Sequence, residues 1–243
     1  MNCWDITLLI VVSIQATSVA YARTPQTKAL LVTFPLPTSF AYLALGQPVD
    51  ATNMLGLALL MLFTHIVRWL HVFWNQHIVV AIVCAAFLYT LLGCAIAHLL
   101  PCHENGMFWM ASGAVLLLGW ALLWFQPPRD EPSHRSPLPI HLKLPIIMAV
   151  ITGLILGKHW LQGFMTVFPM VGVVAAYEAR HSLWTMSRQM SVIMLTIGVM
   201  LIAMHLAQPH TGQYGALAIG WLVFACALSA VLWTRNILHD KLK

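Results

Sequence analysis

The sequence predicts an all-α polytopic membrane protein with about nine transmembrane helices, and three observations indicate this. Hydrophobic residues make up 60% of the chain and charged residues only 8%, whereas soluble domains contain about 45–50% and about 25%. Turn residues divide the chain into apolar runs that are long enough to cross a bilayer. The basic residues fall in alternate connections between these runs. Such a composition excludes a disordered chain, and scattered basic residues argue against binding of nucleic acid despite the net charge of +5.

Proline, glycine, asparagine and glutamine mark the boundaries of the apolar runs. We expect spans at 6–22, 29–46, 53–73, 78–100, 107–126, 144–157, 160–178, 189–207 and 213–234. The loops between them are too short for a soluble domain, so the chain is expected to form a single membrane domain. Its predicted parts are a first four-helix half over 1–100, a linker helix with a cytoplasmic loop over 101–143, and a second four-helix half over 144–243.

Lysine and arginine predict the orientation, because cytoplasmic loops collect them. With nine spans, only Lys158 lies on the side opposite all other basic residues. The N-terminus is then periplasmic and the C-terminus cytoplasmic. Cleavage of a signal peptide after Ala22 is an alternative, but Asp5 stands where a signal peptide carries a basic residue, and cleavage would invert every later loop. The basic residues on the predicted cytoplasmic side are Arg23, Lys28, Arg68, Arg129, Arg135, Lys143, Arg180, Arg188, Arg235, Lys241 and Lys243.

Two Phe-Pro pairs suggest that the chain contains an internal duplication. Phe34-Pro35 lies in the second span and Phe168-Pro169 in the seventh, 134 residues later. A fifth span between two four-span copies would turn the second copy upside down. Inverted repeats of this kind are a recurrent plan of secondary transporters, whose substrates bind at the midplane between broken helices.

Each Phe-Pro pair is a candidate for such a break, because proline removes a backbone donor and clashes with the preceding turn. In lipid the freed carbonyl groups need other partners. Ordinary proline kinks, which are common in transmembrane helices, remain an alternative. The candidate substrate-binding residues are Phe34, Pro35, Pro37, Thr38, Tyr42, Phe168, Pro169 and Tyr177.

The second half contains a motif of a known family. Residues 167–178 (VFPMVGVVAAYE) and 182–189 (SLWTMSRQ) resemble the GlpM-like family of small, four-span bacterial inner-membrane proteins. The resemblance covers about residues 155–235, whereas this chain is twice as long and has an additional span between its halves. That family has been linked to exopolysaccharide production. The resemblance implies a location in the bacterial inner membrane and no particular activity.

Ionisable residues inside or at the end of spans are candidates for proton transfer or gating. A histidine can carry a proton near neutral pH, although a neutral histidine bonded to a carbonyl of a neighbouring helix is an equally simple interpretation. The charged residues after the seventh span have interfacial anchoring as their alternative role. These candidates are His65, His71, His205, Glu178 and Arg180.

Cofactor chemistry has little support in the sequence. His65, His71, His98 and His205 supply enough imidazoles for a haem, but they show no paired helical spacing. The turn at 101–105 is the only dense cluster of metal-ligating types. A disulfide between Cys3 and Cys102 is left open. We therefore predict no catalytic residue, no cofactor and no resident metal.

The functional expectation is a small secondary transporter of an unknown small molecule in the bacterial inner membrane. The alternatives are a non-catalytic partner in envelope or exopolysaccharide assembly and, third, a haem or metal-binding membrane protein. Besides the lipid bilayer, no partner is predicted by name. A homo-oligomer or a membrane complex is left open.

Overall fold

A computed structural model describes residues 3–127, 129–132, 144–145, 147–149, 151–153 and 162–241. Over these residues the secondary structure is helical, without a β-strand. Two segments depart from α-helical geometry: η1 is a π-helix and η2 is a 3-10 helix. The elements are α1 (Cys3–Tyr21), α2 (Pro25–Thr33), α3 (Leu36–Leu45), α4 (Ala51–Arg68), η1 (Trp69–Phe73), α5 (Ile78–Leu99), α6 (Asn105–Phe125), η2 (Gln162–Val167), α9 (Met170–Glu178) and α10 (Leu183–Lys241).

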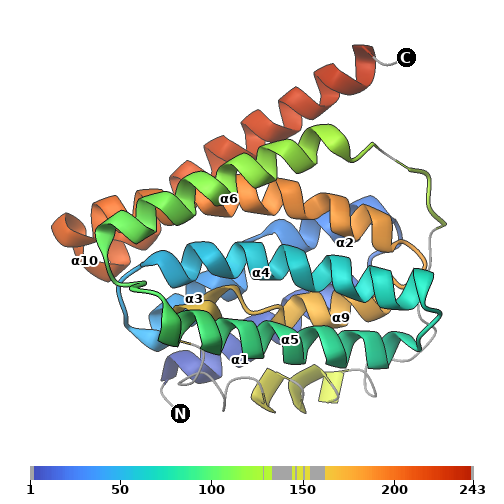
Figure 1. Cartoon of the computed structure of the whole chain (residues 1–243), viewed down its shortest axis with the longest axis horizontal. Coiled ribbons are helices and arrows are strands. Elements are labelled where there is room, and N and C mark those ends of the chain that lie inside the picture. Colours follow the sequence, from blue (N-terminus) through green and yellow to red (C-terminus); the bar gives the residue numbers. More distant parts are fainter. Residues whose placement is uncertain are drawn as a thin grey trace.

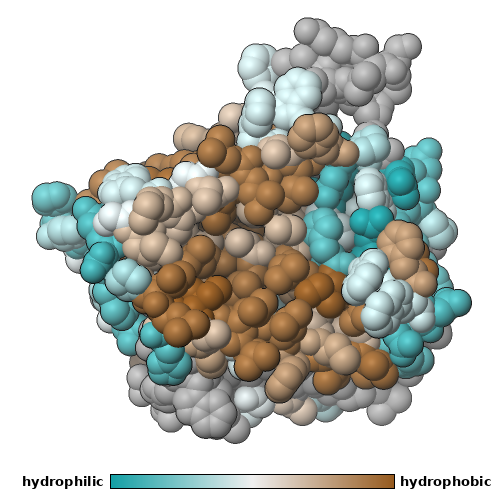
Figure 2. Space-filling model, viewed as in Figure 1, coloured by the Kyte–Doolittle hydropathy of each residue, from teal (hydrophilic) through white to brown (hydrophobic). Residues whose placement is uncertain are grey.

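Six helical stretches in the described residues are long and apolar enough to cross a membrane, and they make the chain a membrane protein. Their axes run broadly along one direction of the molecule (Figure 1). Figure 2 shows a hydrophobic band across the middle of one face, with hydrophilic residues at both ends of the helices. This is the distribution expected for a protein whose middle contacts hydrocarbon. The six stretches are α1, Pro25–Leu45, Ala51–Phe73, α5, α6 and α10 up to Thr234.

The last stretch is longer than one crossing. Its 52 residues would extend about 78 Å as one straight helix, more than twice the hydrocarbon thickness of about 30 Å. Gly212 instead adopts φ 69° and ψ −175°, which interrupts the helical geometry. The chain then folds back on itself (Figure 1), and a Cβ placed on Gly220 would lie 2.6 Å from Met204 Cγ. The two limbs of α10 correspond to the predicted spans 189–207 and 213–234.

The predicted total of nine spans is not reached in the described part of the chain. Residues 146, 150 and 154–157 of the span expected at 144–157 lie outside the described residues, and so do residues 160 and 161 at the start of the span expected at 160–178. The latter is also not one continuous helix, because η2 ends at Val167 and α9 begins at Met170. Nine crossings therefore stay a prediction, whereas the all-helical class and several membrane-length helices are established.

Local sequence explains where the helices begin and end. Asp50 is the N-cap of α4: its carboxylate accepts a hydrogen bond from the Thr52 backbone N–H, and Asn53 completes a capping box. α3 ends at Gly46, whose φ of 66° favours glycine and whose N–H bonds to the Tyr42 carbonyl. The connection between α3 and α4 is thus defined by short-range hydrogen bonds.

Buried apolar side chains form two cores. The first is built mainly from α1, α5 and α9, and the second mainly from α6 and α10. α4 contributes to both: Phe63 belongs to the first core and Met54 to the second. α4 is therefore the central helix, and it separates two layers of the bundle.

Candidate functional site

The predicted second span is broken at Phe34-Pro35. α2 ends at Thr33, Phe34 is extended, and α3 begins after Pro35. Because Pro35 has no N–H, the Leu31 carbonyl loses its helical donor. Gln15 of α1 replaces it, since its Nε2 donates to the Leu31 oxygen (2.7 Å) and to the Phe34 oxygen (3.1 Å). The break is thus stabilised by a side chain that sequence reasoning did not identify.

The predicted seventh span is broken in the same way at Phe168-Pro169. η2 ends at Val167, and α9 begins after Pro169. The Phe164 carbonyl in η2 accepts a hydrogen bond from the buried hydroxyl of Tyr89 on α5 (3.0 Å). In each break, therefore, a side chain from another helix binds a backbone carbonyl near the proline.

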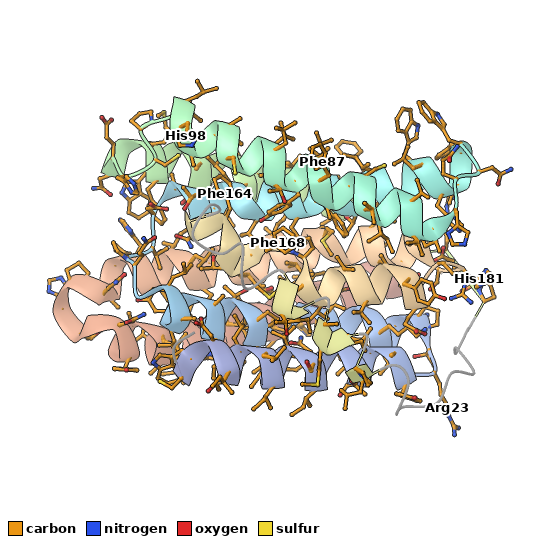
Figure 3. All side chains as sticks on the ribbon, turned by 90° about the horizontal axis from the view of Figure 1, so that it is seen from below. Arg23, Phe87, His98, Phe164, Phe168 and His181 are labelled. Carbon is orange, nitrogen blue, oxygen red and sulfur yellow. The ribbon has the colours of Figure 1, made fainter. Side chains whose placement is uncertain are left out.

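The two broken segments pack together and run in opposite directions. α3, which follows the first break, packs against η2, which precedes the second; α2 likewise packs against α9. Phe168 lies near the middle of the bundle, between the end that carries His98 and the end that carries His181 (Figure 3). The structure therefore brings the two predicted halves of the site together near mid-bundle.

Each break is also tied to another helix through an amide and a threonine. Gln189 Nε2 on α10 donates to Thr33 Oγ1 at the end of α2, over 2.6 Å. Asn53 Nδ2 on α4 donates to Thr166 Oγ1 near the end of η2, over 2.8 Å. All four side chains are buried. In the sequence these residues are recognisable only as polar residues within apolar runs, and nothing there indicates which of them pair.

The phenylalanines of the two breaks contact aromatic rings in the same crossed pattern. Phe34 lies against Phe224 in the second limb of α10, with ring centroids 6.4 Å apart. Phe168 lies against Tyr89 of α5, with centroids 5.0 Å apart and the rings edge to face. The first Phe-Pro pair thus contacts the second limb of α10, and the second pair contacts α5.

Two features of the breaks can serve a polar ligand. The N-termini of α3 and α9 carry no side-chain cap, so the partial positive charge at both helix starts is not offset by a capping side chain. Within the described residues, the Gln15 Oε1 atom beside the first break is buried without a hydrogen-bond partner, and so is the Tyr42 hydroxyl farther along α3. An unpaired buried polar group is costly in a membrane, so these atoms are the chemical candidates for contacting a solute.

The other predicted substrate-binding residues occupy different environments. Pro35, Thr38, Phe168 and Pro169 are buried, whereas Phe34 is 36% exposed. Pro37 and Tyr177 are partly buried. Tyr177 lies at the end of α9, where the Arg180 guanidinium sits 5.1 Å from its ring centroid, and it is therefore separated from the break by most of α9.

A buried lysine was missed by sequence reasoning, which treated Lys28 only as a marker of the cytoplasmic side. The side chains of Lys28 and Glu178 are each 2% exposed, and Lys28 Nζ donates to the Glu178 backbone oxygen over 2.8 Å. Arg180, the neighbouring gate candidate, donates to the Tyr177 carbonyl (3.1 Å). Lys28 thus joins α2 to the end of α9. This contact links the two broken segments at the end of the bundle that carries Arg23 and His181, called here the basic end (Figure 3).

The three histidine candidates all donate from Nδ1 to a backbone carbonyl. His65 bonds to Met61 within α4, His71 bonds to Gln76, and His205 bonds across the bundle to Val49. The Nδ1 proton leaves Nε2 of His65 to accept from the Gln126 amide at 3.0 Å. None of these contacts places a histidine at the Phe-Pro breaks, and a proton-carrying role for them stays a prediction.

The end of the bundle opposite the basic residues carries a contact between a histidine and a carboxylate. His103 Nδ1 lies 2.7 Å from the Asp50 carboxylate. Burial, together with the Asp50 charge, raises the pKa of the nearby Cys102 thiol. Cys3 and Cys102 are both free thiols in the structure. No group of three or more His, Cys, Asp or Glu side chains in the described residues is arranged to hold a metal ion.

No family model matches the chain, and no curated protein or solved structure matches it either. The resemblance of residues 155–235 to the GlpM-like family stays a prediction.

Proposed function

We propose that the chain is a small secondary transporter whose substrate binds where the two broken helices cross. The observation that carries this proposal is the matched pair of breaks at Phe34-Pro35 and Phe168-Pro169, which lie side by side in opposite directions. Discontinuous helices that meet near the midplane are the usual site of solute and ion binding in secondary transporters.

The crossed contacts support an inverted repeat. If α4 and the first limb of α10 are equivalent third helices, then the Gln189–Thr33 and Asn53–Thr166 pairs are the same contact made twice. The aromatic pairs at Phe34 and Phe168 repeat this relation for the fourth helices. Two copies that exchange contacts in this way have their shared axis at the breaks, which is where an alternating-access site is expected.

The division into two cores supports movement around that site. α2 and α9 contribute to the first core, whereas α3 and η2 contribute to both: Ala41 and Phe164 belong to the first, and Tyr42 and Val167 to the second. Each broken helix therefore spans both cores. Rocking of one core against the other would bend both helices at their prolines, where no continuous ladder of helical hydrogen bonds has to be broken.

The chemistry of the site favours a small organic anion that also carries a hydrogen-bond donor. The uncapped N-termini of α3 and α9 suit a carboxylate or another anionic group. The Gln15 Oε1 atom suits a hydroxyl or ammonium donor on the same solute. The resemblance of residues 155–235 to the GlpM-like family supports a location in the bacterial inner membrane, and the distribution of basic residues supports a periplasmic N-terminus.

The test is transport by the purified chain in proteoliposomes. A panel of carboxylates, hydroxy acids, amino acids and inorganic phosphate is applied as a gradient, and uptake and charge movement are recorded. Wild type is expected to move one class of these solutes. The Pro35→Ala, Pro169→Ala double variant is expected to lose at least about tenfold of that flux, because continuous helices close the break and give the N–H groups helical partners.

Pro25→Ala is the matched control. Pro25 occupies the first turn of α2, where a missing N–H has no cost, so this variant should transport as wild type does. Equal flux in the double variant and the wild type would remove the proposed site. Absence of flux for the whole panel, in a protein shown to be folded, would count against transport itself.

A further inference from the structure

A groove of about 340 Å³ opens at the basic end of α4. Its lining consists of His65, Ile66, Arg68, Trp69 and Phe73. Trp69 and Phe73 are 49% and 65% exposed, so the groove faces the perimeter of the bundle. The lining of the groove is mostly apolar and includes one guanidinium, so it is complementary to an amphipathic molecule such as a lipid.

The groove lies next to a second guanidinium. The Arg68 Cζ atom lies 4.2 Å from the centroid of the Trp184 ring, and the Arg129 Cζ atom lies 4.0 Å from the same ring. Both guanidinium groups therefore contact the same indole ring, and their two positive charges lie close together. The indole is itself fixed, since its Nε1 donates to the Pro127 carbonyl over 2.9 Å.

The carboxylate of Glu131, which lies near Arg68, is bound by backbone N–H groups. Glu131 lies close enough to interact electrostatically with Arg68, but its two oxygens accept from the Trp184 and Thr185 backbone N–H groups at 3.1 and 2.7 Å. It therefore binds the N-terminus of α10, which offsets part of its charge. Within the described residues, the salt bridge found is His103–Asp50, at the other end of the bundle.

The backbone beside the groove is irregular. α4 continues into the π-helix η1 at Trp69–Phe73, and the Trp74 N–H bonds to the Trp69 carbonyl five residues earlier. Single π-turns are rare and are concentrated at functional sites. The wider turn places Trp69 and Phe73 on the groove beside Arg68.

The geometry points to a binding site for an anionic phospholipid of the leaflet at this end. An acyl chain occupies the apolar groove, and the lipid phosphate binds the Arg68 and Arg129 guanidinium groups, whose planar donors match a phosphate. A zwitterionic lipid fits less well, because its ammonium group would approach the same two arginines. Basic pockets between transmembrane helices are the physical basis of anionic lipid recognition.

Lipid retention by the full-length protein tests this inference. The protein is purified in detergent, incubated with phosphatidylglycerol or phosphatidylethanolamine of equal chain length, and analysed by native mass spectrometry. Wild type is expected to bind phosphatidylglycerol more tightly. Arg68→Gln and Arg129→Gln are each expected to weaken that binding by about fivefold to tenfold and to leave phosphatidylethanolamine binding nearly unchanged.

Arg23→Gln is the control, because Arg23 is exposed and lies at the same end as His181 (Figure 3). It should bind phosphatidylglycerol as wild type does. Equal binding of the two lipids by wild type, or equal loss in Arg23→Gln and Arg68→Gln, would overturn the inference. So would displacement of phosphatidylglycerol by millimolar inorganic phosphate, which would indicate a headgroup-only anion site. Arg129 lies in an exposed loop, so its variant remains informative even if Arg68→Gln does not fold.

Discussion

At the scale of single residues, buried polar side chains determine how the breaks are held. Gln15 binds the Leu31 carbonyl that Pro35 leaves without a donor, and Asn53 and Gln189 each donate to a threonine near a break. In hydrocarbon no water replaces such partners. Each amide therefore supplies the hydrogen bond that water would supply in a soluble protein. Because the amide reaches only one partner, the bond favours one arrangement of the helices.

Asn53→Ala tests the importance of one such amide. Asn53 Oδ1 accepts from the Asp50 N–H (2.8 Å), and its Nδ2 donates to Thr166. The substitution removes both bonds, so we expect the unfolding free energy to fall by about 1–2 kcal/mol. Titration with sodium dodecyl sulfate in mixed micelles, followed by circular dichroism, measures it. Gln47→Ala, at an exposed position of the α3–α4 connection, should leave the midpoint unchanged. An unchanged midpoint in Asn53→Ala would mean that the pair contributes nothing.

At the scale of elements, the positions of the helices follow closely from local sequence. The runs predicted at 53–73, 78–100 and 107–126 correspond to Ala51–Phe73, α5 and α6 within two residues at each end. Hydrophobic length and the breakers at the loops are properties of short segments, which is why they suffice here. The hairpin inside α10 falls between the predicted spans 189–207 and 213–234, whereas the π-turn of η1 was not predicted from the sequence.

Gly220→Ala tests the hairpin of α10. A Cβ at this position meets Met204 Cγ at 2.6 Å, so the two limbs must separate and the unfolding free energy should fall by about 1–3 kcal/mol. In a Met204→Ala background the same substitution should cost clearly less. Gly113→Ala in α6 is the control, since no atom lies within 4 Å of its added Cβ. An equal cost of Gly220→Ala in both backgrounds would show that the limbs do not pack at this point.

At the scale of the whole molecule, the bundle has two unlike ends. Arg23 and His181 lie at one end and His98 at the other (Figure 3). Arg68, Arg129 and Trp184 are also gathered in one place, and Lys28 meets the end of α9. The polar groups at the opposite end include the Asp50–His103 pair. Basic residues that the sequence spreads over many loops are therefore neighbours in space.

Cysteine labelling in intact cells tests the orientation that this asymmetry predicts. In a variant without native cysteines, Gln47→Cys should react with a membrane-impermeant maleimide from outside. Arg23→Cys should react only after permeabilisation, because its connection is predicted to be cytoplasmic. The reverse labelling pattern would mean that the protein has the opposite orientation in the membrane. Labelling of both from the same side would mean that Pro25–Leu45 does not cross the membrane.

The sequence by itself determined that the chain is a helical membrane protein and where several spans begin and end, and it identified two Phe-Pro pairs as candidate breaks. Hydrophobicity and proline chemistry act within one segment, so they can be recognised without the fold. The tertiary structure alone decided that the two breaks meet, that Gln15 satisfies the first, and that Lys28 is buried against α9. The physical reason is that a polar side chain specifies only what kind of partner it needs. Packing of the apolar faces decides which partner comes within reach.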